Sequence, residues 1–228
     1  MIELLDAVKT YTQGRRVVNA VRGVTLRVNS GEFVSIMGPS GSGKSTLMHL
    51  MGALDTPSSG RAVFHGQDLQ TMSDRQRSLL RRERIGFVFQ AFNLLPNLTA
   101  AENVALPLLL GGQSRRSSLS RACECLERVN MGHRAEHFPD EMSGGEMQRV
   151  AVARALIAEP EAVLCDEPTG NLDTATSREI LTLLAALPEV GKRAVIMVTH
   201  DPTAASYGTR LVKIRDGVVE ADEAVRRN

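Results

Sequence analysis

Hydrophobic residues occur in short blocks that alternate with helical patterns along most of the chain. The blocks are continuous apolar runs, which is typical of strands buried on both faces; they cover residues 32–37, 85–89, 162–165 and 193–198. Between the blocks, apolar residues recur every three or four positions, as from Ser117 to Val129, which predicts helices. Strands that alternate with helices predict an α/β fold with a central sheet covered by helices.

The two ends of the chain have a different pattern. Residues 2–28 alternate loosely between apolar and polar positions, with strands predicted at 17–21 and 24–28 and turns at Gly14 and Gly23. A further strand is predicted at residues 61–64, followed by a turn at His65 and Gly66, and closing strands at 209–221 surround the turn Asp216–Gly217. We therefore expect an opening sheet and a closing hairpin around the α/β core.

One long stretch lacks strand patterns. Residues 73–84 predict a basic helix with Leu79 and Leu80 on its buried side, and after Gln90 an apolar loop leads into helical patterns from 99 to 137. Asp140 or Ser143 caps a later helix that runs to about residue 158. We predict a single domain of 1–228, with a core of about 1–91 and 151–228 and an inserted helical subdomain of about 92–150.

The apolar loop after Gln90 carries Leu94, Leu95 and Leu98. These side chains could pack in the core of the helical subdomain or form a patch for a partner. A loop of this kind presents side chains outward, so we favour docking.

Composition excludes several classes of protein. The chain has 228 residues, a net charge of +1 and few aromatic residues, so neither charge nor base stacking indicates a nucleic acid partner. Three cysteines make no disulfide framework. A zinc site from Cys123, Cys125, His133 and His137 is the weaker alternative to ordinary helix residues, because positions two apart do not share a helix face. The longest apolar run, residues 104–110, is too short to span a membrane, so we expect any membrane role to come through a partner.

The stretch from Gly38 to Thr46 fits the pattern G-x-x-x-x-G-K-[ST] between a predicted strand and a predicted helix. Its glycines let backbone N–H groups converge on a phosphate at the positive end of the helix. Lys44 adds a positive charge, and the Ser45 hydroxyl suits Mg²⁺. A glycine-rich loop that only caps a strand and a helix is the alternative, but the fixed positions and both flanks favour a phosphate site.

Two further strand ends carry polar side chains. Asp166 and Glu167 follow the strand at 162–165, at the sheet edge where the phosphate loop also lies. One carboxylate suits the Mg²⁺ shell and the next can activate a water molecule, although a helix-capping loop is the alternative. His200 ends the strand at 193–198 and can hydrogen-bond a terminal phosphate or that water.

A second anion site is predicted at Ser143–Gly144–Gly145, where a flexible entry exposes N–H groups at a helix start. If both sites serve one nucleotide, either they lie together within one chain or each nucleotide site is completed by a second copy of the chain. Tyr11, in the opening sheet, could stack on a base, although a tyrosine on a strand more often packs against neighbours.

Taken together, these motifs resemble the ATP-binding subunits of ABC transporters over essentially the full chain. The resemblance implies a P-loop NTPase fold with a recombinase-like core, an N-terminal antiparallel β subdomain and the inserted helical subdomain. It implies binding and hydrolysis of ATP with Mg²⁺, and the implied residues fall into three groups. The catalytic residues are Glu167, His200 and Gln90; the metal ligands are Ser45, Gln90 and Asp166; the nucleotide contacts are Tyr11, Gly38, Ser40, Gly41, Gly43, Lys44, Ser45, Thr46, Ser143, Gly144, Gly145 and Asp173.

The resemblance also implies partners. In this family each ATP is held between the phosphate loop of one chain (here residues 38–46) and the signature helix of another (here the helix that begins at Ser143–Gly144–Gly145). The implied dimer therefore joins two copies head to tail. Residues 166–173 and 93–104 are most similar to the subfamily of lipoprotein release, macrolide efflux and division-site complexes. A permease is then expected to dock near residues 91–110 and to hold the chain on the cytoplasmic face of the membrane. A division-type signalling complex that moves no substrate is the alternative within that subfamily.

Departures from the family pattern are modest. Met142 stands where leucine is usual and Glu146 where glutamine is usual, but Ser143 and both glycines are kept. Cys165 is expected to act as a small hydrophobic residue within its strand.

Overall fold

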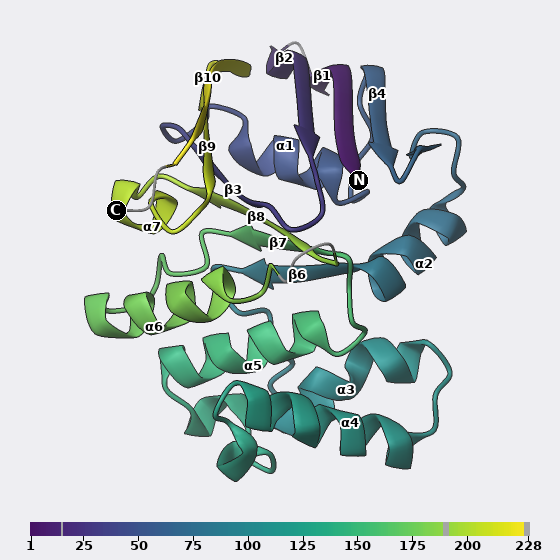
Figure 1. Cartoon of the computed structure of the whole chain (residues 1–228). Helices are drawn as coiled ribbons and strands as arrows, with labels where there is room; N and C mark the ends of the chain where they lie inside the picture. Colours follow the sequence, from purple (N-terminus) through teal and green to yellow (C-terminus); the bar gives the residue numbers. More distant parts are fainter. Residues whose placement is uncertain (15, 189–191, 226–228) are drawn as a thin grey trace.

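The computed structural model describes residues 1–14, 16–188 and 192–225, and its elements form the layers drawn in Figure 1. Within these residues the strands form two sheets. The first is antiparallel, in the order β2-β1-β4-β5: β1 (Ile2–Gln13), β2 (Arg16–Val28), β4 (Ser59–Phe64) and β5 (Gln67–Asp68). The second, the core sheet, has the order β10-β9-β3-β8-β7-β6: β3 (Phe33–Met37), β6 (Ile85–Phe89), β7 (Ala162–Asp166), β8 (Ala194–Thr199), β9 (Arg210–Arg215) and β10 (Val218–Ala224).

Helices cover the core sheet on both sides and form a separate layer at the bottom of Figure 1. Their bounds are α1 (Lys44–Met51), α2 (Asp74–Arg84), α3 (Ala100–Leu110), α4 (Arg115–Arg128), α5 (Gly144–Leu156), α6 (Thr174–Ala185) and α7 (Pro202–Ala205), with 3₁₀ turns at Gly132–Arg134 and Pro139–Glu141. The helix α5 contacts α3 and α4 on one side and β6 on the other. It therefore joins the helical layer to the sheet.

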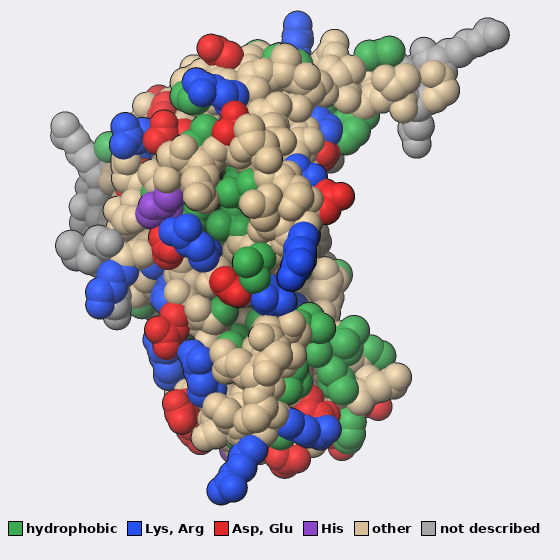
Figure 2. All heavy atoms as spheres, turned by 90° about the vertical axis from the view of Figure 1, so that its right-hand side faces the viewer, with side chains coloured by type: hydrophobic (Ala, Val, Ile, Leu, Met, Phe, Trp, Pro, Cys, Tyr) green, Lys and Arg blue, Asp and Glu red, His purple; other side chains and the backbone are tan. Residues whose placement is uncertain are grey.

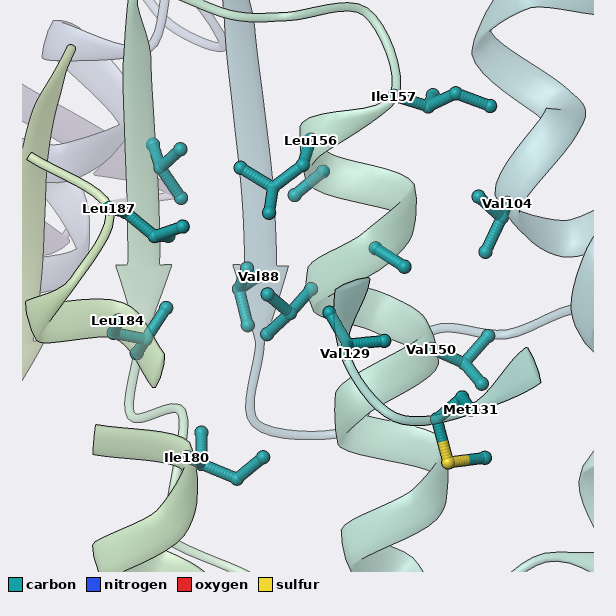
Figure 3. Packing of buried hydrophobic residues seen from close by; sticks show 14 of the residues in the cluster. Val88, Val104, Val129, Met131, Val150, Leu156, Ile157, Ile180, Leu184 and Leu187 are labelled. Carbon is teal, nitrogen blue, oxygen red and sulfur yellow. The ribbon is translucent and has the colours of Figure 1, made fainter. Parts of the chain in front are cut away.

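Strand register explains why the apolar runs are continuous. Strands β6, β7, β8, β3 and β9 are parallel to one another and only β10 is antiparallel to β9 among the described strands of this sheet, so most of the core sheet is buried on both faces. Alternate residues of β7 belong to two hydrophobic clusters on opposite faces of the sheet. Val163 and Cys165 pack on the helical side, toward α5, whereas Ala162 and Leu164 pack toward α1 and the first sheet. Figure 3 shows the helical side, where Val88 of β6 packs near Leu156 of α5.

Local signals set the helix starts. Ser73, Thr99 and Ser143 cap α2, α3 and α5, and each accepts a hydrogen bond from the backbone N–H three residues later. The side chain of a glutamine or glutamate at that third position accepts a hydrogen bond from the backbone N–H of the cap residue. Each pair of bonds therefore satisfies two otherwise free N–H groups. Ser143, and not Asp140, is therefore the cap of α5, and the helix ends at Leu156.

Two expectations from the sequence pattern were wrong. Leu79 was expected on the buried side of α2, but its side chain is 43% exposed, whereas Leu80 is buried. Leu80 packs in the cluster that also holds Ile85 and Leu164, whereas Leu79 remains at the surface. The strands predicted at 17–21 and 24–28 form one strand, β2, in which Gly23 adopts a φ of 74° next to shifts in the pairing with β1.

The apolar loop after β6 is divided between core and surface. Leu94 is half-buried against the helical-side cluster, whereas Leu95 is 48% exposed. Asn103 of α3 holds the loop, since its amide accepts from Leu95 N at 2.7 Å and donates to the carbonyls of Leu95 and Leu98. The loop therefore has a fixed shape that presents Leu95 outward.

Candidate nucleotide site

The phosphate loop lies between β3 and α1 at the carboxyl edge of the core sheet. Lys44 is almost fully buried, at 7% exposure, and its ammonium donates to the carbonyls of Gly38 and Pro39 at 2.8 and 2.9 Å. Gly43 has a φ of 97°, and a Cβ atom there would lie 2.1 Å from the Ala20 carbonyl oxygen. Only glycine fits this position, and the loop holds a buried cation next to the N-terminus of α1.

A cavity of about 1010 Å³ opens over the phosphate loop. It is lined by residues of the loop, of the other core strand ends, of β2 and of the closing turn: Val18, Asn19, Ala20, Arg22, Pro39, Ser40, Gly41, Gly43, Lys44, Ser45, Thr46, Gln90, Glu167, His200, Asp216 and Gly217. The order β9-β3-β8-β7-β6 brings these strand ends together, as expected for a parallel sheet.

Oxygen ligands of the kind that Mg²⁺ prefers meet at the floor of the site. The Ser45 hydroxyl donates to Asp166 Oδ1 at 3.3 Å, across 121 residues of sequence. Burial raises the pKa of Asp166, while the Ser45 bond acts in the opposite direction. Asp166 is half-buried and lies behind Ser45, outside the residues that line the cavity, and a carboxylate beside a hydroxyl in this way suits a divalent cation.

Glu167 is held in an unusual backbone conformation. Its φ is 47°, rare for a residue with a side chain, and its N–H donates to the Val198 carbonyl at 3.0 Å. The side chain turns to His200, whose Nδ1 lies 2.8 Å from Glu167 Oε1. Glu167 is 18% exposed and His200 is 67% exposed, so the pair faces the cavity with the imidazole on its open side.

Gln90 directly follows β6 and is fixed by a reciprocal pair of hydrogen bonds. Its Nε2 donates to Asn171 Oδ1, and Asn171 Nδ2 donates to the Gln90 carbonyl, both at 3.0 Å. The loop after Glu167 therefore fixes the residue that follows β6. The side chains of Gln90 and Glu167 both line the cavity.

The second predicted anion site lies elsewhere. Ser143, Gly144 and Gly145 begin α5 and are outside the set of described residues that line the cavity. Bonds to Glu146 Oε2 come from the backbone N–H and the hydroxyl of Ser143, and together with Arg134 they lower the pKa of Glu146. Glu146, which stands where glutamine is usual in the family, thus completes the cap of α5.

Three other predicted nucleotide contacts, Tyr11, Gly38 and Asp173, also lie outside the cavity lining. The Tyr11 hydroxyl donates to Asp55 Oδ2 at 2.9 Å, and the ammonium of Lys9 lies 5.1 Å from the centre of its ring. Burial raises the pKa of Tyr11, and the bond to Asp55 adds to the effect. Asp173 caps α6 through Ala175 N and Thr176 N.

The closing hairpin contributes residues that sequence patterns did not identify as part of the site. Asp216 and Gly217 line the cavity, and Gly217 N donates to the Ser42 carbonyl at 3.0 Å. Gly217 O in turn accepts from Arg22 N at 2.8 Å. The sequence indicated only a tight turn here, and its position beside the phosphate loop follows from the pairing of β9 with β3.

The family profile described as "ABC transporter" matches residues 21–170 of the chain. The chain belongs to the ABC transporter family. It is therefore an ATP-binding subunit of that family and an ATPase. The resemblance of its motifs to that family is confirmed, as is the P-loop α/β fold.

Relatives within the family include whole chains and parts of longer ones. An uncharacterized ABC transporter ATP-binding protein of Thermotoga maritima is 49% identical over 98% of this chain and 95% of its own length. The corresponding protein MJ0796 of Methanocaldococcus jannaschii is 45% identical over 99% and 98%. The macrolide export ATP-binding/permease protein MacB of Syntrophobacter fumaroxidans is 49% identical over 97% of this chain, which spans only 31% of that relative.

Solved structures of this ABC family confirm the fold at high similarity. A dimeric structure of the ATP-binding cassette MJ0796 in a post-hydrolysis state, bound to ADP and Pi, aligns with a TM-score of 0.91 and 43% identity over all of both chains. A second dimeric structure of MJ0796 aligns equally well, at 44% identity. Among the described residues of this chain, no helix is long and apolar enough to cross a membrane.

Proposed function

We propose that this ABC ATPase works as a head-to-tail dimer in which each ATP is held between Lys44 of one copy and Ser143 of the other. The observation that carries the proposal is the position of the second anion site, whose residues lie outside the cavity of their own chain. The MJ0796 cassettes, solved as dimers, support the pairing of two copies.

Within each site we assign the following roles. Lys44 and the N–H groups of the phosphate loop bind the outer phosphates of ATP. Ser45, Asp166 and Gln90 hold Mg²⁺, which when bound neutralises charge that develops on the phosphate oxygens. Glu167 accepts a proton from the attacking water, and His200 orients the Glu167 carboxylate through Nδ1.

Mixing two inactive variants tests the shared site. Ser143→Asp can still accept the cap bond from Glu146 N–H, but it loses the hydroxyl donor to Glu146 Oε2 and places a negative charge against phosphate, so we expect ATPase activity to fall about 10²–10³-fold. Lys44→Ala disables the other half of the site. In a dimer of one copy of each, one site carries both defects and the other carries none. Random mixing should therefore restore about a quarter of the wild-type rate, measured by phosphate release.

The matched control is Ser114→Asp, which changes the cap of α4 in the same way. It is expected to keep wild-type activity, since α4 does not border the cavity. If the mixture is no more active than its components while both variants remain folded, the shared site is excluded.

We further propose that a permease docks on the face formed by α3 and the loop after β6, and that it holds the ATPase on the cytoplasmic face of the membrane. Figure 2 shows hydrophobic side chains gathered on the lower part of this face, below a band of Lys and Arg side chains. Leu95 and Leu110 are 48% and 71% exposed. A hollow of about 300 Å³ lies nearby, lined by Asn93, Pro107 and Arg154 among others. The MacB relatives, named as ATP-binding/permease proteins, support a partner of this kind.

A double variant tests the docking face. Leu95→Asp/Leu110→Asp should abolish copurification of an integral membrane protein from detergent extracts, because buried anchor residues dominate protein interfaces. The KM for ATP should stay within about twofold, since neither residue lines the nucleotide cavity. Leu79→Asp is the control, because Leu79 is also exposed, at 43%, but lines a separate hollow beside β5. Equal recovery of the same membrane protein by wild-type and double variant would contradict the proposed face.

A further inference from the structure

One arginine of α5 binds the turn that follows Gln90. Arg154 Nη1 donates to the Asn93 carbonyl at 2.5 Å, and Nη2 donates to the Phe92 carbonyl at 2.7 Å. Burial lowers the pKa of Arg154. A planar guanidinium can hold two neighbouring carbonyls at once, which a lysine ammonium does less well.

The turn that Arg154 holds has an unfavourable backbone conformation. Phe92 and Asn93 have φ values of 60° and 52°, so two successive residues with side chains lie in the left-handed region. Such conformations persist where surrounding contacts determine them and often occur at functional sites. The two bonds from Arg154 are contacts of this kind.

The same turn is tied to both anion sites of the chain. Phe92 N donates to the Phe89 carbonyl at 3.2 Å, which closes the turn over Gln90. The Phe92 ring lies against the start of α5, since a Cβ atom on Gly144 would be 3.6 Å from Phe92 Cζ. A shift of the turn would therefore move Gln90 relative to the cavity.

We propose that Arg154 is a positioning residue for Gln90: it fixes the left-handed turn at Phe92 and Asn93 and so sets where the Gln90 amide meets Mg²⁺ and the attacking water. The role assigned to Gln90 rests on the proposed function, but the hold of Arg154 on the turn does not. The guanidinium acts on the backbone two and three residues after Gln90 and is not itself a catalytic group.

Hydrogen exchange of the full chain without nucleotide tests the hold of Arg154 on the turn. Arg154→Met should raise amide exchange in the peptide 89–95 by about tenfold, and Arg154→Lys, which keeps the charge, should show a smaller rise. Exchange in α1 and β3 should stay unchanged. If Arg154→Met destabilises the whole protein, Arg154→Lys still reports on the peptide.

Arg149→Met is the matched control. Arg149 also lies on α5 and also donates to a backbone carbonyl, that of Val129, as well as to Glu179, but it does not reach the turn. Its loss should leave exchange at 89–95 unchanged. Equal exchange of this peptide in wild-type and Arg154→Met, or an equal rise in Arg149→Met, would overturn the proposal.

Kinetics test the consequence for Gln90. Loss of a group that orients a metal ligand typically weakens the metal site by about 10–100-fold. For Arg154→Met we expect the Mg²⁺ concentration for half-maximal ATPase rate to rise by that factor, with the KM for ATP within about twofold. A rise in exchange with unchanged Mg²⁺ dependence would refute the positioning of Gln90 and leave the rest of the proposed function standing. Inactive wild-type protein would instead contradict the proposed function.

Discussion

Glu167→Gln is expected to lower kcat by about 10²–10⁴-fold, the usual contribution of a general base. Glutamine has the same shape but cannot accept the proton of the attacking water. The site should keep its geometry, because the left-handed backbone of Glu167 is held by the Val198 carbonyl and not by its own side chain. Steady-state phosphate release measures the loss.

The same variant should trap the dimer. When hydrolysis stops, ATP stays between the two copies, so gel filtration with ATP should show a dimer. The control is Glu159→Gln, which removes a carboxylate from an exposed pair with Arg121 and should change the rate by less than about twofold. Turnover of Glu167→Gln near the wild-type rate would show that another group is the base. A persistent monomer in the presence of ATP would count against the ATP-bound dimer.

Lys44→Ala is expected to weaken ATP binding and to abolish measurable hydrolysis. The ammonium is buried beside the loop, and its hydrogen bonds go to the neutral carbonyls of Gly38 and Pro39. Lys44 forms no ion pair with a carboxylate in the described part of the chain, so the fold should survive its removal. Loss of a buried charge opposite phosphate should cost about 2–5 kcal/mol of binding, roughly 30- to several-thousand-fold in affinity.

Thermal unfolding with and without ATP measures this effect. The unfolding midpoint of the wild-type protein should rise on addition of ATP, because a ligand that binds only the folded state stabilises it. The midpoint of Lys44→Ala should not rise. Lys213→Ala on β9 serves as the control, since Lys213 does not line the nucleotide cavity. A normal ATP-induced shift in Lys44→Ala would exclude Lys44 as the main phosphate contact.

Short-range patterns predicted much of the fold. The strand, glycine turn and helix around Gly43 follow from backbone conformations that only glycine adopts easily, and the cap at Ser143 follows from hydrogen bonds within four residues. The apolar run at 162–165 became a strand buried on both faces, as its composition indicates. These features depend on neighbours in sequence, so the sequence contains the information needed to predict them.

Pattern reasoning failed where burial depends on the exact contact area. Leu79 and Leu80 have the same polarity and helix propensity, yet only Leu80 is buried. Leu94 and Leu95 differ in the same way, because the amide of Asn103 fixes the direction of their loop. Hydrophobicity alone does not distinguish such neighbours.

By itself the sequence determined the family of the chain and predicted the chemical groups of the nucleotide site, because each motif is a short contiguous stretch with specific spacing. Only the tertiary structure decided which distant groups meet: Ser45 with Asp166, Gln90 with Asn171, and Arg154 with the turn at Phe92. The physical reason is that these contacts depend on the order of strands in the sheet and on the packing of α5 against β6. Both are set by non-local burial, which no short stretch of sequence specifies.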